Sequence, residues 1–144
     1  MGEGPLDDFV KAKQSEIGSE NMVVTGHVPY ETVPAYYQHC DVFVLLSFSD
    51  CNPLVILEAI SCGLPIICTN RAGNAIDFVA EDVNGFIVAP DDLGRIVETL
   101  FYVLSWDEKK MNRAREFAQE VIQKTAYDSV ADEFVSAITK DAQC

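Results

Sequence analysis

Residues 41–69 constrain the fold more than any other stretch, because they read as a strand, a loop, a helix and a second strand. The first piece, 42–46, is an unbroken apolar run that is typical of a strand buried on both faces of a parallel sheet. A helix is expected from Pro53, which a first helical turn tolerates, to Gly63, which ends it. A second buried strand is expected over 66–69. This order predicts an α/β domain with a doubly wound, Rossmann-like parallel sheet.

Two carboxylates stand out here because the residues around them are mostly apolar. Asp50 lies in the loop, and Glu58 follows on a helix otherwise made of Leu, Val, Ile and Ala. A buried charge is costly without a partner, and a helix N-terminus at the carboxyl edge of a parallel sheet favours anionic ligands. Two ordinary alternatives stay open: Glu58 as part of a solvated helix stripe, and Asp50 as a cap or turn residue.

The rest of the chain continues the alternation of strand and helix. Further strands are expected over 22–25 and 86–88. Helices are expected from apolar periodicity and capping residues over 6–17, 30–39, 75–80, 90–105, 107–124 and 127–140. The 144 residues are enough for one domain with its own core, covering 1–144 and ending in C-terminal helices from about 107.

Charge and composition exclude several classes of function. The chain has 10 Lys and Arg against 23 Asp and Glu, and its formal charge of −13 argues against binding to nucleic acid or an anionic membrane surface. No apolar run approaches the roughly 20 residues of a transmembrane helix, so a cytoplasmic location is expected. The five cysteines form no C-x-x-C pair, and neither a metal site nor a disulfide framework is predicted. Cys40, Cys62 and Cys68 are predicted to be buried thiols.

Several short motifs follow one another in a specific order. They are Gly2-Glu-Gly-Pro5, Thr25-Gly-His-Val28, Ser49-Asp50-x7-Glu58-Ala59, Cys62-Gly-Leu-Pro65 and Asn84-Gly-Phe86. In this order and spacing the chain resembles the C-terminal, nucleotide-sugar-binding half of the family-four (group 1) retaining glycosyltransferases of GT-B architecture. Those enzymes carry a Glu-x7-Glu signature, and Asp50 takes the place of its first Glu here. The resemblance extends over nearly the whole chain.

The resemblance implies an enzyme of carbohydrate biosynthesis, a retaining transferase of hexosyltransferase type. It would transfer a sugar from a nucleoside-diphosphate sugar to an acceptor and would need no cofactor and no metal. The acceptor, a glycan, a lipid or a small molecule, would bind a preceding domain, through which the enzyme could also associate peripherally with a membrane. By the pattern of the family, Glu58 would accept hydrogen bonds from the ribose hydroxyls and Asp50 from the sugar hydroxyls.

The same resemblance implies further contacts to the donor. Backbone groups of His27 and Val28 would hold the nucleobase, although an exposed turn histidine is an equally good interpretation of His27. Arg71 is either a contact to the donor phosphate or a solvated loop cation. Backbone N–H groups at the helix start would face the diphosphate and sugar, and these belong to Cys51, Asn52 and Leu54.

The resemblance also predicts what the chain lacks. The family's domain has about six strands in the order 3-2-1-4-5-6, and Gly2 matches the end of the second. The first two strands, with the Arg and Lys that neutralise the diphosphate, are therefore expected to be missing, which leaves strand 22–25 without its neighbours. Arg71 is the only Lys or Arg between Lys13 and Arg95.

The isolated chain is accordingly expected to be the end of a longer enzyme and to be inactive or nearly so. One alternative is a standalone nucleotide-sugar-binding module, which could complete its site with basic residues of another chain. The other is a non-catalytic structural remnant.

Overall fold

A computed structural model describes residues 4–126, which divide into a first unit over 4–36 and a second unit over 37–126. The first unit holds helix α1 (Asp7–Ile17), an extended segment, the 3-10 helix η1 (Tyr30–Thr32) and most of α2 (Val33–Tyr37). The helix expected over 30–39 is therefore shorter and divided. Its first turn is a 3-10 helix because the Thr32 N–H and hydroxyl both donate to the Pro29 carbonyl, at 2.9 and 2.8 Å.

The strand expected over 22–25 is wrong for the described structure. Residues 22–26 have no regular secondary structure and join no sheet. An extended segment becomes a strand only when a second backbone pairs with it, and the described part of the first unit offers no such partner. The predicted helix α1 is confirmed and ends before Gly18, but none of its residues is buried. A unit of this size, residues 4–36, buries little apolar surface on its own.

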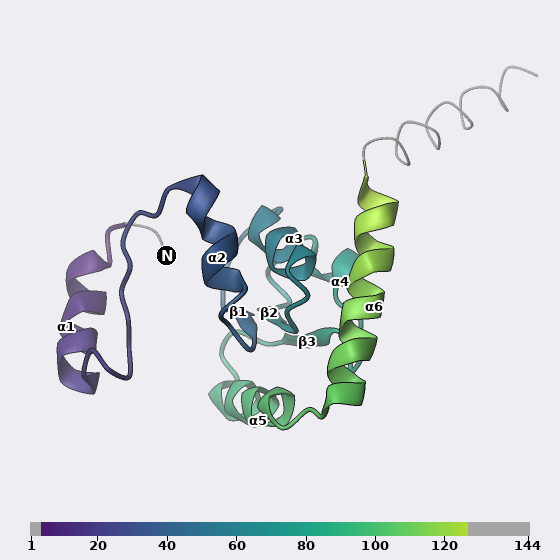
Figure 1. The fold of residues 1–144 in the computed structure, drawn as a ribbon. Coiled ribbons are helices and arrows are strands. Elements are labelled where there is room, and N and C mark those ends of the chain that lie inside the picture. The colour runs from purple at the N-terminus through teal and green to yellow at the C-terminus, as the bar shows by residue number, and fades with distance from the viewer. Residues whose placement is uncertain (1–3, 127–144) are drawn as a thin grey trace, which may run out of the picture. The chain divides into compact units, whose positions relative to one another are not determined.

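The second unit is built on a parallel sheet of three strands in the order β1-β2-β3 (Figure 1). The strands are β1 (Phe43–Leu45), β2 (Ile66–Thr69) and β3 (Gly85–Val88). In the ladders Phe43 pairs with Ile66, and Ile66 pairs with Gly85. Helix α3 (Leu54–Ser61) connects the first two strands, and the short helix α4 (Ala75–Phe78) connects the last two. The α/β class and the strands near 42–46, 66–69 and 86–88 are confirmed.

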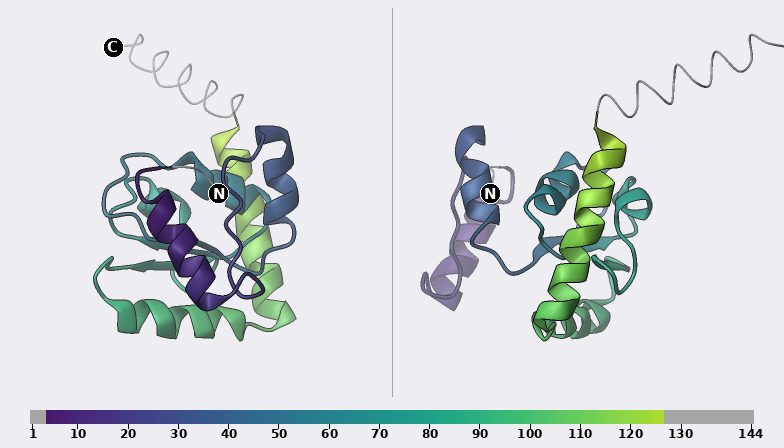
Figure 2. Two further views of the ribbon diagram at one scale, coloured as in Figure 1. Left: turned by 90° about the vertical axis from the view of Figure 1, so that its left-hand side faces the viewer. Right: turned by 45° about the vertical axis from the view of Figure 1, so that its right-hand side comes forward.

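Helices cover both faces of this sheet, as expected of a doubly wound fold (Figures 1 and 2). Helix α3 contacts β1 and β2 on one face, and α5 (Leu93–Leu104) packs against β3 on the other. The core on the α5 side consists of Ile67, Phe86, Val88, Ile96 and Val103. Helix α6 (Glu108–Thr125) packs against α3. Its buried residues are Ala114, Ala118 and Val121, small side chains that allow two helices to approach closely.

The helix termini follow the predicted capping chemistry. The Asp92 carboxylate accepts a hydrogen bond from the Arg95 N–H at 2.9 Å, and Asp107 accepts one from Lys110 N–H at the same distance. Gly63 follows the end of α3 with a φ of +75°, a left-handed conformation that favours glycine. The helix expected over 127–140 lies outside the described residues.

β2 is the central strand, and all four of its side chains are buried. The segment 42–46 is less buried than expected: Val44 of β1 and Leu46, which follows β1, are partly exposed, and β1 lies at the end of the described sheet. The three cysteines that were predicted to be buried differ in their exposure. Cys68 on β2 is buried, and burial raises the pKa of its thiol to about 11. Cys62 is half-buried, and Cys40 is exposed, so its predicted burial is wrong.

A charged and aromatic cluster ties the turn before β3 to the two C-terminal helices. Lys110 Nζ on α6 lies 2.6 Å from Asp82 Oδ1 and 2.5 Å from the Tyr102 hydroxyl oxygen. It also lies over the rings of Tyr102 and Trp106, at 4.6 and 5.3 Å from their centroids. Hydrogen bonds to Lys110 and Tyr102 lower the pKa of Asp82, and the bond to Asp82 raises the pKa of Lys110.

None of the described helices is both long enough and apolar enough to cross a membrane.

We expect Ile60→Ala, in α3, to lower the free energy of unfolding by about 2–5 kcal/mol, because it leaves a cavity in a packed core. Ile60 is 1% exposed, whereas Ile76 on α4 is 81% exposed. The same substitution at Ile76 should change stability by less than about 0.5 kcal/mol. Urea denaturation followed by circular dichroism measures both, and equal effects would contradict the proposed core.

Candidate functional site

Two loops meet where β1 and β2 end, because the segments that follow these two strands stay hydrogen-bonded to each other beyond the sheet. The Thr69 hydroxyl donates to the Ser47 carbonyl at 2.5 Å. Further on, the Asp50 N–H donates to the Arg71 carbonyl at 3.1 Å, and the Gly73 N–H donates to the Asp50 carbonyl at 2.8 Å. These bonds hold the loop 47–53 against the loop 70–74 at the carboxyl edge of the sheet, where open α/β sheets bind ligands.

Asp50 is half-buried at the centre of this contact. Its Oδ1 accepts a hydrogen bond from the Asn52 N–H at 3.2 Å, which is the local geometry of an Asx turn. The alternative that treated Asp50 as a turn residue is thus correct as far as this oxygen goes. The other oxygen has no hydrogen-bond partner within residues 4–126, so it is available to a ligand hydroxyl.

The start of α3 carries free backbone donors, though fewer than expected. Pro53 occupies the cap position and provides no side-chain bond to the helix. The N–H groups of Cys51 and Leu54 have no acceptor among the described residues. Asn52 differs from the prediction, because its N–H is already bonded to Asp50. Any contact of Asn52 with a ligand must therefore come from its exposed side chain.

Glu58 is half-buried on α3 and has one partner in the second unit, Tyr37. The Tyr37 hydroxyl donates to Glu58 Oε2 at 3.2 Å, and the Tyr37 ring packs edge-on against Phe43 at 5.8 Å between centroids. Tyr37 is 5% exposed, and burial together with the Glu58 charge raises the pKa of its hydroxyl. Glu58 is therefore not simply one residue of a solvated stripe. The sequence indicated Glu58 but not Tyr37, because 21 positions separate the two residues.

Asn74 is a second residue that the sequence analysis missed. It immediately precedes α4. Its side-chain nitrogen donates to Asn52 Oδ1 at 2.8 Å and to the Pro53 carbonyl at 3.2 Å. Arg71 lies in the same loop with its side chain exposed, and in residues 4–126 only its carbonyl has a hydrogen bond. It is the one cation in either loop.

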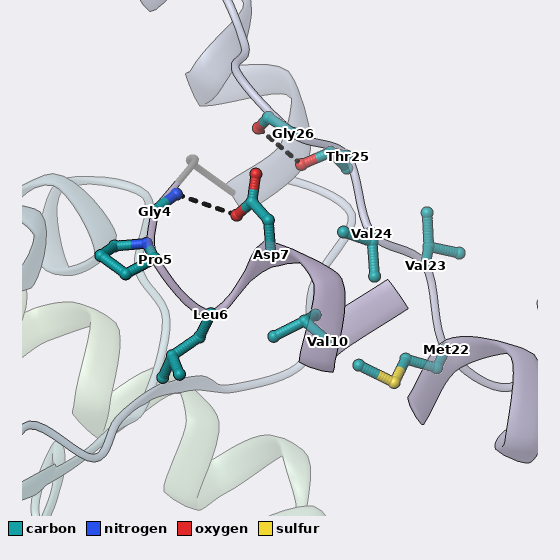
Figure 3. Close-up of a pocket in the computed structure, with 10 residues that line it drawn as sticks. All are labelled: Gly4, Pro5, Leu6, Asp7, Val10, Met22, Val23, Val24, Thr25 and Gly26. Carbon is teal, nitrogen blue, oxygen red and sulfur yellow. Dashed lines mark hydrogen bonds between the residues drawn. The ribbon is translucent and has the colours of Figure 1, made fainter. Parts of the chain in front are cut away.

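His27 and Val28 lie in the first unit, His27 in an exposed bend and Val28 half-buried. The same unit has a cavity of about 510 Å³ whose lining reaches Gly26, the residue before His27 (Figure 3). Its walls are the residues before and within α1 and the extended segment up to Gly26, and its apolar lining includes Pro5, Leu6, Val10, Met22 and Val24. At the start of α1 the Gly4 N–H donates to Asp7 Oδ1 at 2.8 Å.

Within residues 4–126, no three His, Cys, Asp or Glu side chains are grouped to hold a metal ion.

Comparison with known proteins gives one consistent result. The family model for glycosyl transferases group 1 matches residues 1–121. The sulfoquinovosyl transferase SQD2 of Arabidopsis thaliana is 33% identical over 143 residues, which are 95% of this chain and 27% of that protein. The chain spans 17–40% of the length of the curated relatives compared with it.

Solved structures show the same fold. Anabaena HepE in complex with UDP and glucose superposes with a TM-score of 0.74 at 20% identity, over 96% of this chain and 39% of that one. The C-terminal domain of a group 1 glycosyl transferase, LpcC of Francisella tularensis, has a TM-score of 0.68 at 23% identity, over 85% of this chain and 65% of that one.

We expect Tyr37→Phe to lower the free energy of unfolding at pH 7 by about 1–2 kcal/mol, because the Glu58 carboxylate then loses the hydrogen bond that the Tyr37 hydroxyl donates to it. The raised pKa of Tyr37 adds a pH dependence. Its contribution to stability is complete below about pH 10, the ordinary tyrosine pKa, and is lost as the pH rises through the folded-state value.

The stability difference between wild type and Tyr37→Phe should therefore shrink above pH 10 in urea denaturation. Tyr30→Phe, at an exposed tyrosine, is the control and should have no effect at either pH. A difference that grows with pH would contradict this assignment.

We expect Gly73→Ala to separate the two loops, since a Cβ at Gly73 would overlap the backbone carbonyl of Cys51. A loss of about 1–3 kcal/mol in unfolding free energy should follow. Gly94→Ala, in the first turn of α5 where a Cβ would lie 3.6 Å from Asp92 Oδ1, an ordinary van der Waals distance, should be neutral or slightly stabilising. Thermal denaturation of the two variants compares them directly.

Proposed function

The chain belongs to the group 1 glycosyltransferase family, and we propose that it carries the nucleotide-sugar-binding part of a retaining glycosyltransferase. The observation that supports this best is the set of groups at the carboxyl edge of the sheet. An unpaired oxygen of Asp50, the free N–H groups of Cys51 and Leu54, and Glu58 come from one loop and the helix that follows it. Acceptors for hydroxyls and donors for an anion are what a nucleoside-diphosphate sugar requires.

Each carboxylate has one oxygen engaged by the protein and one available to the donor. Glu58 is steadied by Tyr37 through Oε2, which leaves Oε1 to accept from the ribose hydroxyls. Asp50 is steadied by the Asn52 N–H through Oδ1, which leaves Oδ2 to accept from the sugar hydroxyls. Holding a carboxylate by one oxygen fixes the direction of the other, and such preorganisation lowers the entropy lost on binding.

The remaining donor contacts are proposed as follows. The N–H groups of Cys51 and Leu54 and the helix dipole of α3 face the diphosphate, with Arg71 as the nearby cation. In the first unit the backbone of His27 and Val28 contacts the nucleobase.

In the proposed reaction the bond between the anomeric carbon and the diphosphate oxygen breaks, and the acceptor oxygen bonds the same face of that carbon. Because the new bond forms on the face that the diphosphate leaves, the configuration is retained. The acceptor proton passes to the leaving diphosphate. The N–H donors at α3 stabilise the negative charge that grows on the diphosphate as it leaves. The acceptor would bind a part of the enzyme outside this chain.

A binding module without transferase activity is the second candidate. It is favoured by the scarcity of positive charge, since Arg71 is the one cation in the two loops. UDP is the first ligand to test, because HepE was solved with UDP and glucose. Release of glucose from UDP-glucose by the chain, alone or with an acceptor, would separate the enzyme from the binding module.

We expect the 144-residue chain to bind UDP or GDP, and Glu58→Gln to weaken that binding roughly tenfold or more, because hydrogen bonds to a charged acceptor are lost. Glu98→Gln, at an exposed position on α5, removes the same charge away from the site and should leave affinity unchanged. Isothermal titration calorimetry measures all three proteins. Equal affinities of Glu58→Gln and wild type would show that Glu58 does not bind the nucleotide.

A further inference from the structure

The amide of Asn52 is held in one orientation by a buried neighbour, Asn74. The Asn74 side chain is 6% exposed, and its nitrogen donates both to the Pro53 carbonyl and to Asn52 Oδ1. A backbone carbonyl can only accept, so the Asn74 atom that meets it must be the nitrogen. It follows that the Asn52 atom facing Asn74 is its oxygen. The Asn52 NH₂ group is then the end that remains available, and it has no partner among residues 4–126.

We propose that Asn74 is a positioning residue for donor binding, which turns the Asn52 amide so that its NH₂ group, and not its oxygen, meets the diphosphate. The inference rests on the proposed function, because it concerns the anionic part of the same ligand. It assigns no chemistry to Asn74 itself, which acts through Asn52.

The orientation matters because this site has few positive charges. Asn52 cannot offer its backbone N–H, which is bonded to Asp50. With its oxygen outward, the Asn52 side chain would repel a phosphate oxygen, and with its NH₂ outward it donates to one. A side chain that selects between these two states decides whether Asn52 supports or opposes binding of an anion.

Stability alone does not account for an asparagine at this position. Asn74 Oδ1 is buried and has no hydrogen-bond partner in the described structure, and such a group is unfavourable. The backbone contact between the two loops does not need the Asn74 side chain, because it runs through the Asp50 and Gly73 N–H groups. Variants of Asn74 are therefore expected to fold with both loops in place.

The test is Asn74→Asp in the full 144-residue chain, with UDP as the probe. An ionised carboxylate can only accept, so it would bind the Asn52 NH₂ group and turn the Asn52 oxygen outward. We expect UDP affinity to fall at least tenfold, as for the loss of a hydrogen bond to a charged group.

The matched control is Asn84→Asp. Asn84 is also a buried amide, bonded to the Phe78 carbonyl and the Ala80 N–H, but it lies in the turn before β3. It should lower stability and leave the UDP affinity of the folded protein unchanged.

A double-mutant cycle with Asn52→Ala separates orientation from charge. If Asn74 acts through Asn52, the variant with both changes binds UDP no more weakly than Asn52→Ala alone. If the added negative charge repels UDP directly, the two effects add, and the inference is overturned. Should Asn74→Asp fail to fold, Asn74→Leu removes the donor without adding charge, and a several-fold loss of UDP affinity is expected. Unchanged affinity of a folded Asn74→Leu would also overturn the inference.

A measurement without ligand keeps the inference separate from the proposed function. In NMR spectra of the free wild-type protein, the Asn74 NH₂ protons should exchange slowly with water and those of Asn52 quickly. In Asn74→Asp the Asn52 NH₂ protons should become protected, and unchanged exchange would overturn the inference even if UDP binds. Failure of the wild-type chain to bind UDP or GDP would count against the proposed function, while the exchange rates still decide the orientation of Asn52.

Discussion

The position of the Asp50 loop depends on hydrogen bonds, two between backbone groups and one from the Thr69 hydroxyl, that continue the contact between β1 and β2 beyond the sheet. The two strands are only three and four residues long, yet the chains that leave them stay joined through Ser47, Asp50 and Gly73. Together with the Asn74 bonds to Asn52 and the Pro53 carbonyl, these bonds between the loops fix the start of α3 relative to the carboxyl end of β2. The arrangement of the donor-binding groups proposed for the two loops, Asp50, Cys51 and Arg71, follows from this contact.

The electrostatic character of the site is unusual for a protein proposed to bind a diphosphate. The chain has a formal charge of −13, and Arg71 is the one cation in the two loops. Backbone N–H groups, the dipole of α3 and an oriented amide supply partial positive charge without any ionised side chain. Such donors act only at short range and in fixed directions. A site of this kind therefore depends on the rigidity of its loops more than a site built on lysines and arginines does.

The sequence predicted most of the second unit because its signals are local. The apolar runs, Pro53, Gly63 and the capping aspartates each mark an element by the chemistry of neighbouring residues. Strand pairing is not local. Segment 22–25 was predicted to be a strand from its own residues, although its neighbours were expected to be missing, and β1 was expected to be more deeply buried than it is. For the site, Asp50 and Glu58 could be chosen from sequence, whereas Tyr37 and Asn74 could not. Their contacts cross 21 residues of chain or more, and nothing in their immediate surroundings indicates them.

Cys68 gives the central strand a property that the sheet alone would not have. Its sulfur is enclosed on every side, and its pKa of about 11 keeps it in the unreactive thiol form at neutral pH. An alkylating reagent can therefore reach it only when β2 separates from its neighbours. The rate at which this one sulfur is labelled in the native protein therefore reports how often β2 separates from its neighbours, and Cys68 is a natural probe of that opening.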